Sequence, residues 1–164
     1  MMKSLYWVTA PESSAATIVA IARQVHVDFP EREEVFANRL LLYPSGCLLL
    51  TERGNQKVWG YLLGHPWQSG IGIALNSVID KLPASPDCFY LHDIALLSKT
   101  RGHGMGEAGL AAVESIARTE GLSQIVLVAL ADALQFWRGK DFWPVGKPAD
   151  PSYGPDAQYL AKQL

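Results

Sequence analysis

The stretch from Arg101 to Leu110, RGHGMGEAGL, places four glycines within nine residues and constrains the fold more than any other feature. An apolar run, residues 89–97, precedes it, and a segment with helical spacing of apolar residues follows it. Glycine allows a backbone to take positive φ angles or to approach a ligand closely. The first turn of a helix has free N–H groups that bind anions. The sequence therefore predicts a strand, an anion-binding loop and a helix.

Three interpretations of this loop fit the residues. Its glycines could only relieve packing in a tight strand-to-helix connection. Alternatively, Gly104, Gly106 and Gly109 match the GxGxxG pattern of dinucleotide-binding oxidoreductases, with Asp132 after the next strand. In that fold the first glycine ends the strand, whereas residues 98–101 intervene here. The third interpretation rests on the spacing of Arg101 from Gly104 and Gly106.

Length and charge narrow the class of protein. With 164 residues, the chain is expected to form a single domain, residues 1–164. The net charge is -2 and basic residues are scattered, so nucleic acid is not an expected partner. The start, MMKSLYWVTAPESS, lacks the apolar core of a signal peptide, and no apolar run approaches the roughly 20 residues that span a bilayer. We therefore expect a cytoplasmic protein without a membrane partner.

The two cysteines, Cys47 and Cys88, lie in apolar runs without metal-ligand spacing. Two buried thiols and no bound metal are expected.

Periodicity predicts a mixed order of elements. The expected strands are residues 5–9, 47–51, 58–63, 89–97, 125–130, 142–145 and 157–161. The expected helices start near Pro11 and at residues 31, 75, 106 and 133, and the last four end near residues 42, 81, 119 and 139. Gly54 and Asn55 fit a hairpin turn, and the strand–loop–helix–strand unit implies one parallel crossover. The fold class is α/β, with an α+β mixed sheet and helices on both faces.

Arg101-x-x-Gly104-x-Gly106 resembles the acyl-CoA pyrophosphate loop of the GCN5-related N-acetyltransferases, the GNAT family. The segments VWGYLLGHPW, YLHDIALL and ALQFWRGKDF are similar to the family's second hairpin strand, its fourth strand and its C-terminal helix-to-strand segment. The resemblance implies the acyl-CoA N-acyltransferase fold, with a central mixed sheet flanked by helices. It also implies that acetyl-CoA donates its acetyl group to a primary amine of an unidentified small molecule or peptide, by direct attack in a ternary complex.

The family pattern carries over to particular positions. A bulge in the fourth strand would open a V in which pantetheine pairs with backbone groups, and the Leu96 N–H would bind the thioester carbonyl. Trp137 would pack against CoA. The expected CoA-binding residues are Ile94, Ala95, Leu96, Arg101, Gly102, His103, Gly104, Met105, Gly106 and Trp137.

An amine is protonated at pH 7, so its attack needs a base. His92 is the candidate, because histidine titrates near neutral pH and some relatives carry a base histidine at this place. The alternative is that His92 and Asp93 only fix the bulge. Adjacent strand residues point to opposite faces, so Asp93 is expected to be structural rather than part of a dyad. Trp137 stands where many relatives carry an acidic tyrosine. Either no acid is needed, since a thiolate is a tolerable leaving group, or Tyr153 or Tyr90 protonates it.

The acceptor is expected between the early helices and the late loop, with Trp67 and Tyr153 as walls. His65 and Trp67 could equally only pack within their loop. Acidic residues, Glu31 among them, could favour a cationic amine or only be solvated. A homodimer is an open alternative, since relatives commonly pair through their C-terminal strands. A CoA-binding sensor without catalysis is the rival function.

Overall fold

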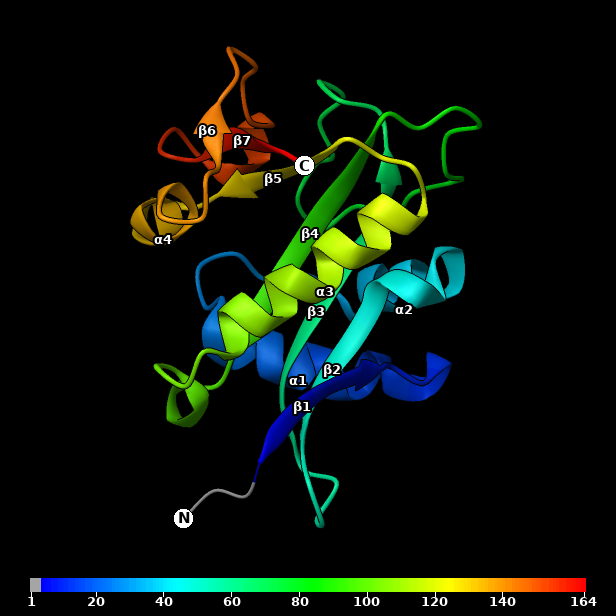
Figure 1. Ribbon diagram of the computed structural model, residues 1–164, viewed down its shortest axis with the longest axis vertical. Helices are drawn as coiled ribbons and strands as arrows, with labels where there is room; N and C mark the ends of the chain where they lie inside the picture. Colours follow the sequence, from blue (N-terminus) through cyan, green and yellow to red (C-terminus); the bar gives the residue numbers. More distant parts are fainter. Residues whose placement is uncertain (1–3) are drawn as a thin grey trace.

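The computed structural model describes residues 4–164 and builds them around one mixed sheet (Figure 1). The strands lie in the order β1-β2-β3-β4-β5-β7-β6. Their bounds are β1 Leu5–Thr9, β2 Cys47–Glu52, β3 Val58–Trp67, β4 Cys88–Leu96, β5 Gln124–Ala129, β6 Trp143–Pro144 and β7 Gln158–Gln163. The helices are α1 Ala15–Val25, α2 Glu33–Leu42, α3 Met105–Thr119 and α4 Leu134–Arg138.

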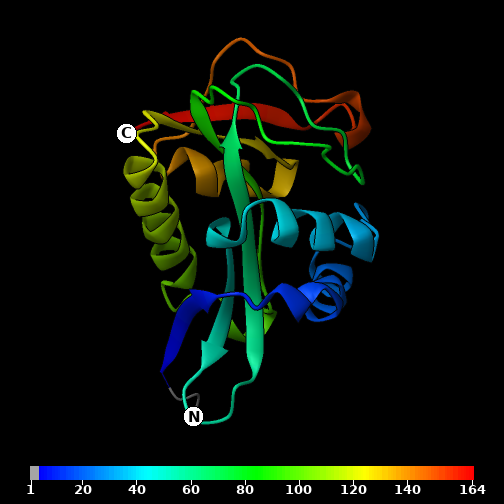
Figure 2. The ribbon, with the colours of Figure 1, turned by 90° about the vertical axis from the view of Figure 1, so that its right-hand side faces the viewer.

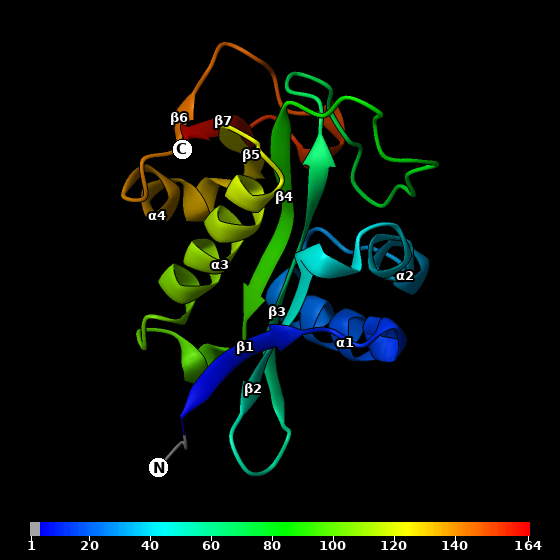
Figure 3. The same cartoon turned by 45° about the vertical axis from the view of Figure 1, so that its right-hand side comes forward.

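Helices cover both faces of the sheet, as the sequence predicts. Seen edge-on, α3 lies on one side of the central strands, and α1 and α2 lie on the other (Figures 2 and 3). The apolar stripe of α3, with Leu110, Val113 and Ala117, is buried against the sheet. Ile18 of α1 and Phe36 of α2 are buried in a separate core on the opposite face. Each helix therefore gains its stability from one apolar side, which the 3.6-residue periodicity reveals.

The predicted hairpin and crossover are both present. Strands β2 and β3 pair antiparallel, and β4 and β5 pair parallel with α3 between them. The parallel pairing, however, is confined to Phe89 with Ile125 and Tyr90 with Val126. Beyond Tyr90 the two strands diverge (Figure 3). This divergence leaves one edge of β4 without a neighbouring strand in the middle of the sheet.

A β-bulge interrupts β4 close to the divergence. Leu63 of β3 pairs with Asp93, while the next residue, Gly64, pairs with Leu91, so His92 is the extra residue. Leu91 belongs to the core beneath α3, but His92 and Asp93 both contact groups on the side of α1 and α2. The prediction that these two side chains point to opposite faces is therefore wrong, because the inserted residue breaks the two-residue alternation.

Three predicted elements differ from the structure. The expected helix at residues 75–81 is absent, and residues 68–87 form an irregular connection in which Asn76 has a φ of 59°. Strand β3 continues past Leu63 to Trp67, because residues 64–67 pair with β4. The late strand expected at residues 142–145 contains only Trp143 and Pro144.

Cys47 and Cys88 are free and buried, as expected. Within residues 4–164, the helices are too short or too polar for any of them to cross a membrane.

Candidate active site

The glycine loop owes two of its glycines to backbone conformation. Gly102 and Gly104 have φ angles of 77° and 75°, in the left-handed region that side chains disfavour. A Cβ atom at either position would meet nothing within 4 Å, so the open side of the loop is free for a ligand. The first helical hydrogen bond of α3 runs from Ala108 N–H to the Gly104 carbonyl. The N–H groups of residues 105–107 therefore precede the helical ladder and carry the positive end of the helix dipole.

Side chains hold this loop in place. Arg101 Nε donates to the Leu96 carbonyl at 3.3 Å, and His103 Nδ1 lies 3.0 Å from the Arg101 carbonyl oxygen. Trp7 Nε1 donates to the Met105 carbonyl at 2.9 Å, which ties the start of α3 to β1. Arg101 thus shapes the loop and also leaves an exposed positive charge beside it.

The diverging edge of β4 presents backbone groups to the space beside the loop. Leu97 N–H donates to the Trp59 carbonyl of β3 at 2.9 Å. Because backbone groups alternate along an antiparallel strand, Ala95 also faces β3, whereas Ile94 and Leu96 face the gap toward β5. Of the three residues predicted as backbone ligands, Ala95 therefore does not offer its N–H to the gap. Its side chain is buried in the core. Ile94 and Leu96 supply the donors that an extended ligand could pair with.

One cavity of about 630 Å³ joins the gap, the loop and the bulge. Its loop end is lined by Ile94, Leu96, Arg101, Gly102, Gly104, Met105, Gly106, Phe136 and Trp137. Its other end is lined by Val25, His26, Phe29, Glu31, Leu75, His92, Asp93 and Tyr153. The cavity therefore connects a positively polarised cradle with a cluster of titratable side chains.

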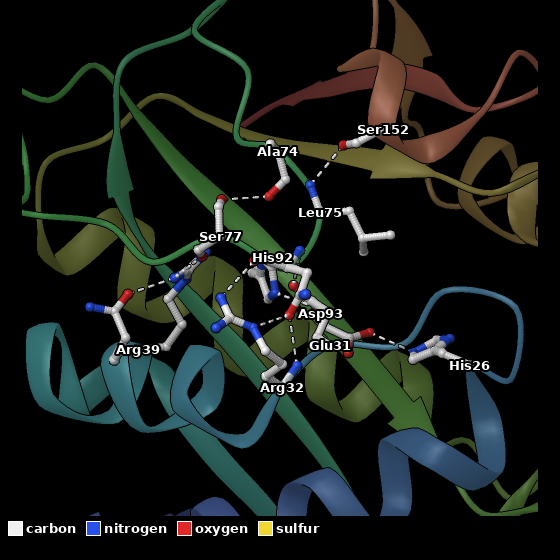
Figure 4. Close-up of polar contacts among 12 residues, drawn as sticks. His26, Glu31, Arg32, Arg39, Ala74, Leu75, Ser77, His92, Asp93 and Ser152 are labelled. Carbon is white, nitrogen blue, oxygen red and sulfur yellow. Dashed lines mark hydrogen bonds and ion pairs between the residues drawn. The ribbon is translucent and has the colours of Figure 1, made fainter.

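His92 is held by a carboxylate. Its Nε2 lies 2.9 Å from Glu31 Oε1, and the two side chains are 0% and 7% exposed (Figure 4). Burial raises the pKa of Glu31, but the charge and hydrogen bond of His92 outweigh it and lower that pKa. The other oxygen of Glu31 accepts from the Asn76 N–H at 2.9 Å. With Nε2 directed at Glu31, the Nδ1 atom of His92 remains buried without a partner.

Asp93 holds a second histidine. Its Oδ1 lies 2.7 Å from Nε2 of His26, the residue that follows α1, and its Oδ2 accepts a short hydrogen bond from the Tyr61 hydroxyl. Burial raises the pKa of Asp93, but the hydrogen bond and charge of His26 outweigh burial and lower it. Two carboxylate–histidine pairs therefore meet at the bulge, from different parts of the chain (Figure 4).

The two tyrosines predicted as acids, Tyr153 and Tyr90, hold their protons tightly, and of these two only Tyr153 lines the cavity. Tyr153 is buried at the cavity wall, and burial raises its pKa far above the ordinary value. Burial likewise raises the pKa of Tyr90. Trp137 packs edge-on against Phe136 and Phe142, and its indole has no acidic proton at neutral pH.

Most of the residues predicted from sequence meet at this cavity. Ala95 and His103 are not among its lining residues, and neither are His65 and Trp67. His65 is instead buried and stacked on Tyr90, and burial lowers its pKa to about 3. The sequence reasoning missed His26, because one histidine after a helix gives no periodic signal. It named Glu31 as an acid that could favour a cationic amine or only be solvated, and did not predict its contact with His92.

Comparison with known proteins finds a family model that covers most of the chain. The family model described as "Acetyltransferase (GNAT) family" matches residues 5–142. No curated protein matches the chain.

Solved structures are similar over almost the whole chain. The loading GNATL domain of CurA from Lyngbya majuscula has a TM-score of 0.80 and 12% identity, over 98% of each chain. Ard1 from Thermoplasma volcanium has a TM-score of 0.74 and 16% identity, over 98% of this chain and 97% of that chain. Arabidopsis thaliana Naa50, solved with the bisubstrate analogue CoA-Ac-MVNAL, has a TM-score of 0.72 and 14% identity, over 98% and 99%. At these identities the similarity shows the fold.

Proposed function

The chain belongs to the acetyltransferase (GNAT) family, and from this premise we propose that it transfers the acetyl group of acetyl-CoA to a primary amine of a small molecule or peptide. The observation that carries the proposal is the cavity itself. It places an anion cradle, an unpaired strand edge and two carboxylate–histidine pairs along one continuous space. Solved structures with the same fold contain coenzyme A, which agrees with acetyl-CoA as the donor.

The residues present fit the donor. Its diphosphate is an anion, and the N–H groups of residues 102–106 at the start of α3 offer it a positively polarised cradle. The left-handed Gly102 and Gly104 leave the space beside them open. His103 and Met105 contribute their backbone N–H groups, and Arg101 contributes its exposed positive charge. Gly106 lies at the first turn of α3 near Phe136. Trp137 packs at the same end of the cavity.

The edge of β4 orients the rest of the donor. The Ile94 and Leu96 N–H groups would pair with the amides of pantetheine and with the thioester, as a missing strand would. In this proposal the Leu96 N–H stabilises the negative charge that develops on the thioester carbonyl oxygen. Ala95 supports the strand from the β3 side.

His92 is the general base in this proposal, and Glu31 is its positioning residue. Glu31 accepts the Nε2 proton, so the lone pair of Nδ1 is free to take a proton from the amine. Because the His92 side chain is sealed from solvent, the proton reaches it through a water or after the acceptor fills the cavity. The acceptor occupies the end of the cavity near Phe29, Leu75 and Tyr153.

The test is a panel of amines incubated with the protein and acetyl-CoA, with release of free CoA thiol as the measurement. Amino acids, polyamines and short peptides cover the acceptor classes. At least one amine is expected to release thiol faster than the control without an amine, and His92→Ala is expected to remove this increase. Acetyl-CoA binding with no amine-dependent release across the panel would favour a sensor.

A further inference from the structure

A second histidine faces the same cavity more openly than His92. The His26 side chain is 23% exposed and lines the cavity, whereas the His92 side chain is 0% exposed. His26 Nε2 is fixed 2.7 Å from Asp93 Oδ1, and Tyr61 donates to the other carboxylate oxygen. The hydrogen bonds within residues 4–164 leave His26 Nδ1 free. Asp93 thus fixes the orientation of the His26 ring through Nε2 and leaves Nδ1 available to a substrate.

The groups that face His26 favour its protonated form. Burial lowers its pKa, but the hydrogen bond and charge of Asp93 outweigh burial, so that the pKa is raised above the usual value. Glu31, from the segment between α1 and α2, and Asp132, which follows β5, add negative charge in the same direction. Tyr61, from β3, has its pKa raised by burial and by Asp93, so it stays neutral. In the protonated ring, Nε2 donates to Asp93 and Nδ1 carries the second proton, toward the cavity.

His26 lines the same cavity as the strand edge that would hold the reacting end of the donor. The cradle lies beyond the last residue of β4, whereas the bulge lies at residues 92 and 93. Ile94 and Leu96, whose N–H groups face the gap, lie between them. A donor with its diphosphate on the cradle and its thioester carbonyl on the Leu96 N–H has its sulfur in the same cavity that His26 lines, and Asp93 holds His26 there.

The other groups at the cavity are poor proton donors. Trp137 has no acidic proton at neutral pH, and Tyr153 has a raised pKa. We propose that His26 is the acid that donates its Nδ1 proton to the sulfur of CoA as the thioester C–S bond breaks. This inference rests on the acetyl transfer proposed above.

The protons and electrons balance. The amine nitrogen forms a bond to the carbonyl carbon, and the C–S bond breaks with its electron pair on sulfur. His26 gives one proton to sulfur, and the nitrogen loses its extra proton to His92. An ammonium acceptor brings two protons that the amide does not keep, of which one restores His26 and one leaves to solvent.

The test needs no knowledge of the acceptor. Histidine ring signals are followed by NMR over a pH titration of the whole protein, alone, with CoA and with desulfo-CoA, which lacks the thiol. We expect both ligands to bind, but only CoA to change the His26 titration. His65 does not line the cavity and burial lowers its pKa to about 3, so its ring signals are the reference that neither ligand should change. The pKa of the bound thiol, read from thiolate absorbance, is expected to rise by about one unit in His26→Gln, since the imidazolium no longer stabilises the thiolate.

Kinetics with an acceptor from the amine panel supply the second readout. His26→Gln is expected to lower kcat about 100-fold, with little change in KM for acetyl-CoA. The matched control is Arg23→Gln, at an exposed position in the last turn of α1, which is expected to keep kcat. If His26→Gln fails to fold, Asp93→Asn tests the same proton, because it lowers the pKa of His26.

Two results would overturn the inference: a His26 titration that responds equally to CoA and desulfo-CoA, or an unchanged thiol pKa in a folded His26→Gln. If neither ligand binds, the proposed acetyl transfer itself fails. If both bind and His26 responds equally to them, only the role of His26 fails.

Discussion

Glu31 Oε1 and His92 Nε2 lie 2.9 Å apart although the two residues are 61 positions apart in the chain. The contact joins the segment between α1 and α2 to the bulge of β4, so the helical layer and the sheet contribute one residue each. A buried carboxylate–histidine pair fixes the tautomer of the ring, which prepares the opposite nitrogen for proton transfer.

We therefore predict that Glu31→Gln and His92→Gln each lower kcat about 100-fold, because both remove the same oriented base. The double variant should lose little more than either single variant, since the two residues act as one unit. Glu33→Gln, at an exposed position in the first turn of α2, is the control and should keep its rate. Calorimetry should show unchanged acetyl-CoA affinity, and additive losses would argue against a shared role.

The glycine loop offers a matched pair of variants. Gly104 and Gly121 have φ angles of 75° and 73°, and a Cβ at either would meet nothing within 4 Å. Gly104→Ala and Gly121→Ala should each cost about 1 kcal/mol of unfolding free energy from backbone strain. Only Gly104→Ala should also weaken acetyl-CoA binding, by at least about tenfold, because its methyl group enters the cradle. Equal affinities in the two variants would mean that CoA does not use this loop.

The ion pair between His26 and Asp93 predicts a pH-dependent stability. The pKa of His26 is raised in the folded state. The ion pair therefore contributes fully to the free energy of unfolding below the unfolded-state pKa of about 6.5, and this contribution is lost as the pH rises through the folded-state pKa. The free energy of unfolding of the wild type minus that of His26→Gln should therefore fall as the pH rises above about 6.5. Urea denaturation at a series of pH values measures it. A difference that grows with pH would contradict this sign.

The central strands predict where the fold depends on packing. Leu62 of β3 is fully buried in the core beneath α3, whereas Leu41 at the end of α2 is 67% exposed. Leu62→Ala should lower the free energy of unfolding by about 2–5 kcal/mol. Leu41→Ala should change it by less than about 0.5 kcal/mol. Denaturant titration compares them, and similar losses would show that β3 is not the center of the core.

Local patterns predict much of this fold. The glycine loop, the apolar stripe of α3 and the hairpin at Gly54 and Asn55 each depend on neighbours within about one helical turn or one tight turn. The helix expected at residues 75–81 is absent because contacts distant in the sequence determine this segment. Ile73 and Ile79 are buried, but long-range hydrogen bonds such as that from Asn38 Nδ2 to the Ile79 carbonyl fix the segment, and no local pattern encodes them.

The catalytic end of the site lies beyond such local reasoning. The bulge at His92 becomes visible only through the pairing register of β3 and β4. The bulge places the Asp93 side chain on the same side as that of His92, and brings its carboxylate to His26, 67 positions away in the chain. The sequence indicates that polar residues interrupt an apolar strand, but not which partners satisfy them.

Amide hydrogen exchange at β4, measured by NMR with and without acetyl-CoA, tests the central claim most directly. The Ile94 and Leu96 amides face the gap, whereas the Ala95 amide faces β3 and is an internal reference. We predict that acetyl-CoA slows exchange at Ile94 and Leu96 and leaves Ala95 nearly unchanged. Exchange at Ile94 and Leu96 that stays the same with saturating acetyl-CoA would contradict the account.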